Sequence, residues 1–248
     1  QAGHHGPHRE RGRAACAARR PECCGGGVTQ DAAQRGIAAG VVAMTPIAIA
    51  TEDELSEAVA LRLVAELPEP CCVTHRLRKN GFGYLRSKMD SWRQMAMHQV
   101  VLVLTDLDQL ACPLALRDDW AGKTRLPQRL LLRIAVREVE AWALADHKAM
   151  RHLVGTKGVL PPLPDALPDP KQVLLKLAKG APKDIRADLL RNLPGGAIGQ
   201  GLGYNARLVS WVSKDWEPAR AAERSPSLAR ARKRLREAVA PNGSMPAN

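Results

Sequence analysis

Aromatic and acidic residues are both in short supply in this chain. It has one Phe, two Tyr and five Trp among 248 residues. Proteins that hold single strands by base stacking need aromatic platforms, so the composition argues against that class. Asp and Glu number 25 against 37 Lys and Arg, which gives a formal charge of +12. This excess favours a polyanionic partner, nucleic acid before a membrane surface, held mainly through phosphates. The alternative is a compositional bias of the genome towards Arg and Ala.

The chain also lacks a cysteine framework and a long apolar run. Its six cysteines are Cys16, the adjacent pairs Cys23–Cys24 and Cys71–Cys72, and Cys112, and none forms a C-x-x-C motif. This spacing predicts free thiols in a reducing compartment, hence a cytoplasmic protein. No apolar run reaches the roughly 20 residues that span a bilayer, so we expect no membrane partner.

The two ends of the chain differ from the rest. Residues 1–43 are rich in Gly, Ala, Arg, His and Cys and show no strand or helix period. They are interpreted as a disordered or non-native extension upstream of a natural start at Met44. A secretory signal is the alternative, because Arg35 precedes a mildly apolar stretch that ends in small residues. Residues 241–248 are predicted to be a disordered tail.

From Met44 onward, strands and helices alternate. Strands are predicted at 46–51, 71–77, 100–108 and 129–136, with helices over 54–67, 84–97 and 137–154 between and after them. This order predicts an α/β domain over 44–154 with a mostly parallel sheet flanked by helices. A proline-rich connector follows at 155–170. Residues 171–240 read as a basic, helical C-terminal extension, interrupted by a glycine-rich stretch at 194–203 that is expected to be a flexible loop.

The stretch QVVLVLTDLD, residues 99–108, is the most informative part of the sequence. Its five consecutive apolar residues indicate a strand covered on both faces. Asp106 and Asp108 follow it. If the strand continues through them, both carboxylates lie on one face, separated by about 6.6 Å of rise. Two such charges repel unless a cation lies between them, and Mg²⁺ or Mn²⁺ is the expected occupant.

Three further acids follow predicted strands. Glu52 comes directly after the first, and Glu138 and Glu140 come after the fourth. Because the carboxyl ends of parallel strands meet at one edge, we expect a Mg²⁺ site with a spare glutamate that exchanges protons. Such a site suits phosphoryl transfer. For Glu138 and Glu140 the alternative is a preference of acids for the first turn of a helix.

The last predicted helix is strongly basic. Its candidate nucleic-acid ligands are Arg230, Arg232, Lys233 and Arg234. A solvated cationic face is the equally simple interpretation.

At these residues the chain resembles the TOPRIM module of topoisomerases, primases and OLD-family nucleases. Ala50-Thr51-Glu52 with Glu57 matches the first family motif, and Asp106-Leu107-Asp108 matches the second. Asp53 replaces the usual glycine and Ser56 the usual aspartate. The stretches RIAVREVEAWALAD and GYNARLVSWV further resemble an uncharacterised bacterial TOPRIM-like family, some of whose relatives lie near phage-defence systems.

The resemblance implies a catalytic Glu52, Mg²⁺ at Asp106 and Asp108, and second-metal or supporting roles for Glu138 and Glu140. It predicts a Mg²⁺-dependent nuclease that acts on DNA or RNA. An ATPase or another subunit is the expected class of partner, and no particular oligomeric state is predicted. A topoisomerase is disfavoured because the tyrosine-bearing domain is missing. The alternatives are a phosphatase of the haloacid dehalogenase type and a non-catalytic binding protein on the same fold.

Overall fold

The structure, a computed structural model, describes residues 44–78 and 82–240. The expectations for residues 1–43 and 241–248 lie outside the described residues. None of the helices in the described ranges has the length and hydropathy needed to cross a bilayer.

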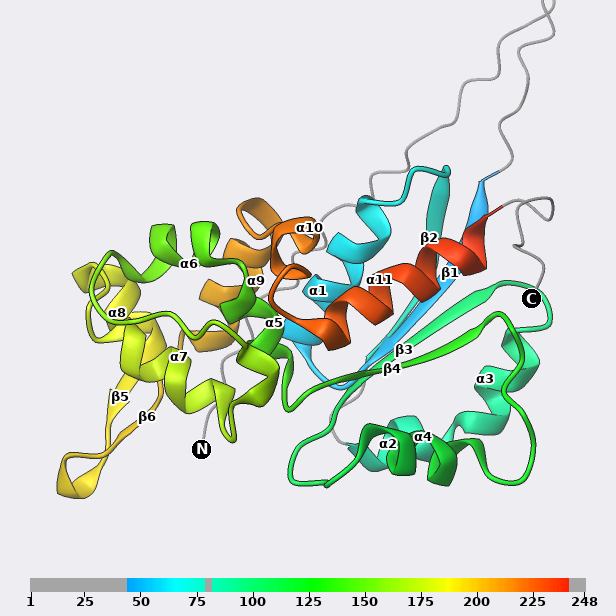
Figure 1. The fold of residues 1–248 in the computed structure, drawn as a ribbon, viewed down its shortest axis with the longest axis horizontal. Coiled ribbons are helices and arrows are strands. Elements are labelled where there is room, and N and C mark those ends of the chain that lie inside the picture. The colour runs from blue at the N-terminus through cyan, green and yellow to red at the C-terminus, as the bar shows by residue number, and fades with distance from the viewer. Residues whose placement is uncertain (1–43, 79–81, 241–248) are drawn as a thin grey trace, which may run out of the picture. The chain divides into compact units, whose positions relative to one another are not determined.

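A four-stranded parallel sheet lies between helices in the right-hand part of Figure 1. Its strands stand in the order β2-β1-β3-β4. Their bounds are β1 Thr45–Thr51, β2 Cys71–Arg78, β3 Val100–Asp106 and β4 Leu130–Ala135. The two central strands, β1 and β3, are buried along almost their whole length, which explains their unbroken apolar runs. The predicted α/β class with a parallel sheet is confirmed.

Helices cover both faces of the sheet. Side chains alternate between the two faces of the sheet: Ile47 and Leu102 pack into one hydrophobic cluster, and their neighbours Ala48 and Val101 pack into another. The helices that contribute to the first cluster beside the sheet are α1 Glu54–Ala65, α5 Val139–Ala145 and α11 Pro226–Val239. Those of the second are α2 Phe82–Ser87, α3 Met89–Met95 and α4 Pro113–Ala121.

The single helix expected over 84–97 is wrong, because it is divided into α2 and α3. Lys88 leaves helical geometry, with φ −102° and ψ 9°. The Trp92 indole N–H then donates to the Leu85 carbonyl at 3.1 Å. The break lets both side chains enter the same buried cluster.

The remaining elements form a largely helical region that shares the first core. They are α6 His147–Val154, a 3₁₀ turn at Pro164–Ala166, α7 Pro170–Ala178, α8 Lys183–Leu189, α9 Tyr204–Lys214 and α10 Pro218–Ala221. A single hydrophobic cluster contains residues from both regions, from Ile47 in β1 to Val239 in α11. Packing therefore continues across the proline-rich segment.

The glycine-rich stretch contains a strand rather than only a loop. Strands β5 Leu190–Asn192 and β6 Ile198–Gln200 pair in antiparallel fashion, joined by a 3₁₀ turn at Pro194–Gly196. Gly195 and Gly196 both have φ near +76°, a conformation that glycine adopts without strain. The glycines thus form a hairpin turn, and the expectation of a flexible loop is wrong.

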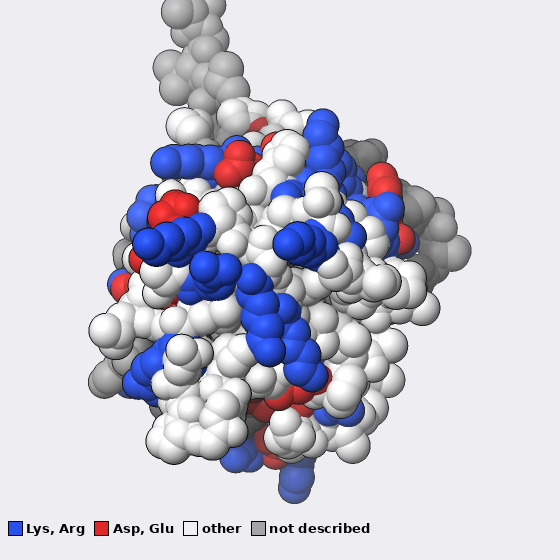
Figure 2. Space-filling model, turned by 90° about the vertical axis from the view of Figure 1, so that its left-hand side faces the viewer, with Lys and Arg blue, Asp and Glu red and all other residues white. Residues whose placement is uncertain are grey.

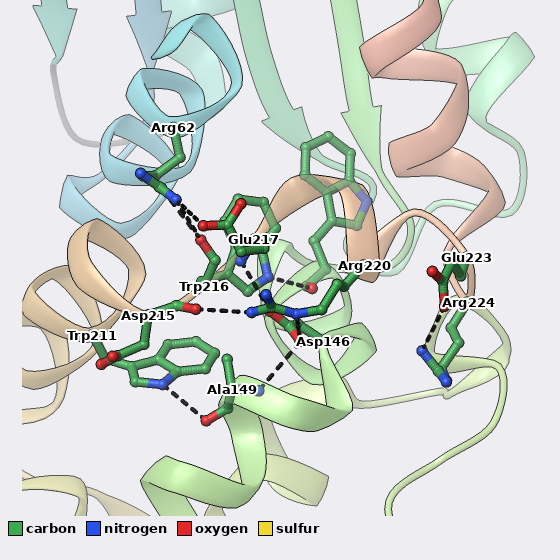
Figure 3. A network of polar contacts seen from close by, with 11 residues as sticks. Arg62, Asp146, Ala149, Trp211, Asp215, Trp216, Glu217, Arg220, Glu223 and Arg224 are labelled. Atoms are coloured by element: carbon green, nitrogen blue, oxygen red, sulfur yellow. Dashed lines mark hydrogen bonds and ion pairs between the residues drawn. The ribbon is translucent and has the colours of Figure 1, made fainter. Parts of the chain in front are cut away.

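A buried polar network ties this helical region to the sheet layer (Figure 3). Asp146, between α5 and α6, is fully buried and accepts hydrogen bonds from the Arg220 guanidinium at 2.9 and 2.7 Å. Its carboxylate also accepts from the backbone N–H groups of Ala149 and Glu217. Arg62 of α1 donates to the Trp216 carbonyl at 3.2 and 3.1 Å. These contacts fix α6, α9 and α10 against the first layer of helices.

Candidate active site

The carboxyl ends of β1, β3 and β4 meet at one edge of the sheet. Thr51 pairs with Leu104, and Asp106 pairs with Ala135. Glu52, the residue after β1, reaches β3: its Oε1 accepts from the Thr105 hydroxyl and from the backbone N–H of Asp106, the latter at 3.4 Å. The predicted convergence of Glu52 and Asp106 is therefore present.

Each of these two carboxylates is held by one oxygen. Asp106 Oδ1 accepts from the backbone N–H of Val139 at 2.9 Å, at the beginning of α5. No hydrogen bond from a described residue reaches Glu52 Oε2 or Asp106 Oδ2. Both carboxylates are thus fixed in position, and each still has one oxygen that accepts no hydrogen bond from a described residue.

Asp108 does not continue the strand. β3 ends at Asp106, Leu107 is buried, and Asp108 is exposed with φ +50°. The backbone N–H groups of Leu107 and Asp108 both donate to the Arg137 carbonyl at 2.9 Å, which turns the chain across the end of β4. The expectation of two aspartates on one extended face is therefore wrong, although Asp108 remains beside the same edge.

Glu138 and Glu140 connect this edge to the helical region. Glu138 Oε2 accepts from the backbone N–H of Lys171 at 3.1 Å. Glu140 is buried, and its Oε1 accepts from the Tyr204 hydroxyl at 3.0 Å and lies 3.4 Å from Lys171 Nζ. Sequence reasoning assigned no role to Lys171 or Tyr204, because neither follows a predicted strand; Tyr204 lies in the stretch GYNARLVSWV, which was noted only for its resemblance.

Burial, and then repulsion between neighbouring acids, raises the pKa of these carboxyl groups. Burial, followed by the negative charges of Glu140 and Glu52, raises the pKa of Asp106 well above its usual range. Burial also raises the pKa of Glu52, although the hydrogen bonds from Thr105 and Asp106 oppose the effect. For Glu140, burial raises the pKa against the opposing charge of Lys171. One lysine therefore faces several carboxylates, and the edge carries excess negative charge.

This donor set fits a divalent cation that is shared with a substrate. Mg²⁺ is commonly bound by one or two carboxylates and completes its shell with water and phosphate oxygens. Asp106 offers its free Oδ2, and the exposed Asp108 carboxylate accepts no hydrogen bond from described residues. Over the described ranges, no group of three or more His, Cys, Asp or Glu side chains is arranged to hold a metal ion. The edge therefore does not fit a cage made of protein ligands alone.

The basic residues predicted on the last helix have different surroundings in α11. Arg232 forms a two-point ion pair with Glu66 at 2.6 and 2.9 Å, and only 13% of its side chain is exposed. Arg234 bonds Glu237 one turn along the helix. Arg230 and Lys233 are exposed. Arg232 is thus engaged in packing α11 against α1, whereas the other three reach the surface.

A second basic surface lies on the helical region. Residues 147–191 contain nine Lys and Arg against four Asp. Figure 2 shows Lys and Arg side chains in a band across the face formed by this part of the molecule. Lys157, Lys176 and Lys179 line an open pocket of about 530 Å³ beside Val159. The sequence prediction did not single out this surface.

No family model, curated protein or solved structure matches the chain. The resemblance to TOPRIM proteins therefore stays a prediction.

Proposed function

We propose that this protein is a Mg²⁺-dependent phosphodiester hydrolase that acts on nucleic acid. The observation that carries the proposal is the arrangement of Glu52 and Asp106, two acids fixed by one oxygen each at the ends of neighbouring strands. The net charge of +12 suits a polyanionic substrate. A TOPRIM-like nuclease of phage defence, working with an ATPase subunit on DNA or RNA, is the finer form of the proposal.

The residues of the edge take separate roles in this proposal. Asp106 and Asp108 would hold Mg²⁺, and the bound ion would lower the pKa of a water ligand and neutralise charge on the phosphate. Glu52 accepts a proton through its free Oε2, and its raised pKa suits that task. Glu138 and Glu140 position Lys171, whose ammonium group neutralises negative charge at the edge.

The test compares the full chain with Asp106→Asn and with a matched control, Asp118→Asn. Asp118 is an exposed aspartate of α4 that pairs with Arg117. Each protein is incubated with plasmid, single-stranded DNA and RNA in Mg²⁺, Mn²⁺ or EDTA. We expect metal-dependent cleavage by the parent and by Asp118→Asn, and a loss of at least about a hundredfold in Asp106→Asn.

Two results would contradict the proposal. The first is cleavage that survives Asp106→Asn, because it would come from elsewhere. The second is the absence of both cleavage and any Mg²⁺-dependent rise in the melting temperature of the parent. Hydrolysis of a small phosphomonoester without cleavage of nucleic acid would favour the phosphatase alternative.

A further inference from the structure

Arg133 is a cation on a core-facing position of β4. It pairs in register with Leu104, and its neighbours two residues away, Leu131 and Ala135, belong to the hydrophobic cluster beneath α11. Side chains alternate along a strand, so Arg133 lies on the same face as these residues. Asp106 pairs with Ala135 on this face. Arg133 therefore lies about 6.6 Å before the acidic edge along the strand direction.

The guanidinium of Arg133 forms no ion pair within the described part of the chain. Its Nε is buried without a hydrogen-bond acceptor, and no described acid forms an ion pair with it. A buried donor that lacks a partner loses its hydration and gains nothing in return, and the penalty is larger for a charged group. Such a group requires an explanation, and a bound anion supplies one.

The charged neighbours of Arg133 are mostly cationic. Arg230 and Arg234 lie one turn apart on α11, which packs against β4, and Arg117 comes from α4 on the opposite face of the sheet (Figure 1). Burial and the charges of Arg234, Arg117 and Arg230 lower the pKa of Arg133 to about 10 against the opposing charge of Glu237, so Arg133 stays charged at neutral pH. β4 is an edge strand of the sheet. The arginines therefore lie along the outermost strand of the sheet, close to the strand ends that carry the acids.

We propose that Arg133, with Arg230 and Arg234, forms a phosphate site that holds the backbone of a nucleic acid next to the acidic edge. The proposal rests on the proposed function for its substrate class. Guanidinium groups bind phosphate oxygens through paired N–H donors, and they desolvate more readily than lysine ammonium groups. The exposed lysines of the helical region are already solvated, so a phosphate stabilises them less than it stabilises Arg133.

The test measures binding of the full chain in EDTA, so that no cleavage interferes. A labelled single-stranded oligonucleotide and a labelled duplex are titrated with the parent, Arg133→Gln, Arg133→Lys and Arg186→Gln. Arg186 is a matched control, an exposed arginine of α8 in the second basic surface. We expect Arg133→Gln to weaken binding roughly five- to tenfold and to lower the slope of log affinity against log salt by about 1, with partial rescue in Arg133→Lys.

A thermal measurement keeps the test independent of misfolding. In phosphate-free buffer, Arg133→Gln should melt at the same temperature as the parent or higher, because it removes an uncompensated cation. Inorganic phosphate at constant ionic strength should raise the melting temperature of the parent and of Arg186→Gln more than that of Arg133→Gln.

Other outcomes overturn the anion site. A lower melting temperature of Arg133→Gln in phosphate-free buffer would make Arg133 a structural residue. Normal binding by Arg133→Gln, with a loss in Arg186→Gln, would place the nucleic acid on the second basic surface. Binding that depends on Arg133, with neither cleavage nor a Mg²⁺-dependent rise in the melting temperature of the parent, would overturn the nuclease function and leave the phosphate site standing.

Discussion

Replacing Asp146 with Asn tests the polar network that fixes the helical region to the sheet layer (Figure 3). The carboxylate is fully buried and accepts four hydrogen bonds. Arg220 donates two, at 2.9 and 2.7 Å, and the backbone N–H groups of Glu217 and Ala149 donate the others, at 2.9 and 3.2 Å. Asparagine has the same shape but only one acceptor oxygen. Its amide nitrogen must therefore face two donors.

The expected loss follows from these contacts. Removing one partner of a buried ion pair costs about 3–5 kcal/mol, because the remaining charge stays desolvated. Arg220 is partly exposed, with 35% of its side chain accessible, so water recovers part of the loss. We therefore expect the free energy of unfolding to fall by about 3 kcal/mol. For a chain of this size that corresponds to roughly 6–12 °C in melting temperature.

Urea unfolding monitored by tryptophan fluorescence measures this loss. The matched control is Asp169→Asn, because Asp169 caps α7 through a single bond to the N–H of Gln172 at 2.8 Å. Asn caps helices as well as Asp, so the control should change stability by less than about 0.5 kcal/mol. A loss below 1 kcal/mol in Asp146→Asn would refute the reasoning, since it would mean that the buried carboxylate contributes no more than an exposed one.

The pH dependence of the same difference has a definite sign. Burial alone would raise the pKa of Asp146, but the hydrogen bonds from Arg220 and from the N–H groups of Glu217 and Ala149 bring the pKa below its usual range. The folded protein then releases this proton at a lower pH than the unfolded chain does. The stabilisation is complete above about pH 5 and is lost as the pH falls through the folded pKa. The difference between parent and Asp146→Asn should stay constant from pH 8 to 5 and shrink below about pH 4.

Three further predictions concern the site and its supports. In metal-free buffer at pH 7, Asp106→Asn should raise the free energy of unfolding in urea by roughly 1 kcal/mol, because the substitution removes charge repulsion. Because the pKa of Asp106 is raised in the folded parent, the parent should gain stability as the pH falls towards about 4, and the variant should gain less. Lys171→Met should cost about 1–2 kcal/mol by the same assay, because buried Glu140 loses its cation, and the cost should diminish as the pH falls and Glu140, whose pKa is raised, takes up a proton. Gly201→Ala should lower stability by about 1–3 kcal/mol in thermal unfolding, because its Cβ would lie 2.2 Å from the Asp188 carbonyl oxygen.

The parallel sheet was predictable because its cause is local. Short unbroken apolar runs between amphipathic helices have few other solutions, and parallel topology brings strand ends to one edge. The meeting of Glu52 with Asp106 follows from that topology alone. The turn at Asp108 does not, because it depends on hydrogen bonds to the Arg137 carbonyl, a residue 29 positions away. Long-range contacts of this kind leave no periodic signal.

Lys171 and Arg133 were missed for a related physical reason. Lys171 follows a proline-rich segment, and only the packing of α7 against α5 brings its ammonium group to Glu140. Arg133 interrupts the apolar run RLLLRIAV, and that interruption is the available signal. A charge at a core-facing position of a strand needs a partner, whichever way the chain folds.

Charge is left unneutralised both at Arg133 and at the acidic edge. The acidic edge has free carboxylate oxygens and raised pKa values, and Arg133 has a buried donor without an acceptor. These opposite charges lie on one face of the sheet within about two residues of rise, yet no ion pair joins Arg133 to Asp106 or any other described acid. Each therefore needs a partner of its own. A divalent cation at the acids and a phosphate at Arg133 would neutralise both, and a phosphodiester bound with Mg²⁺ supplies the two together.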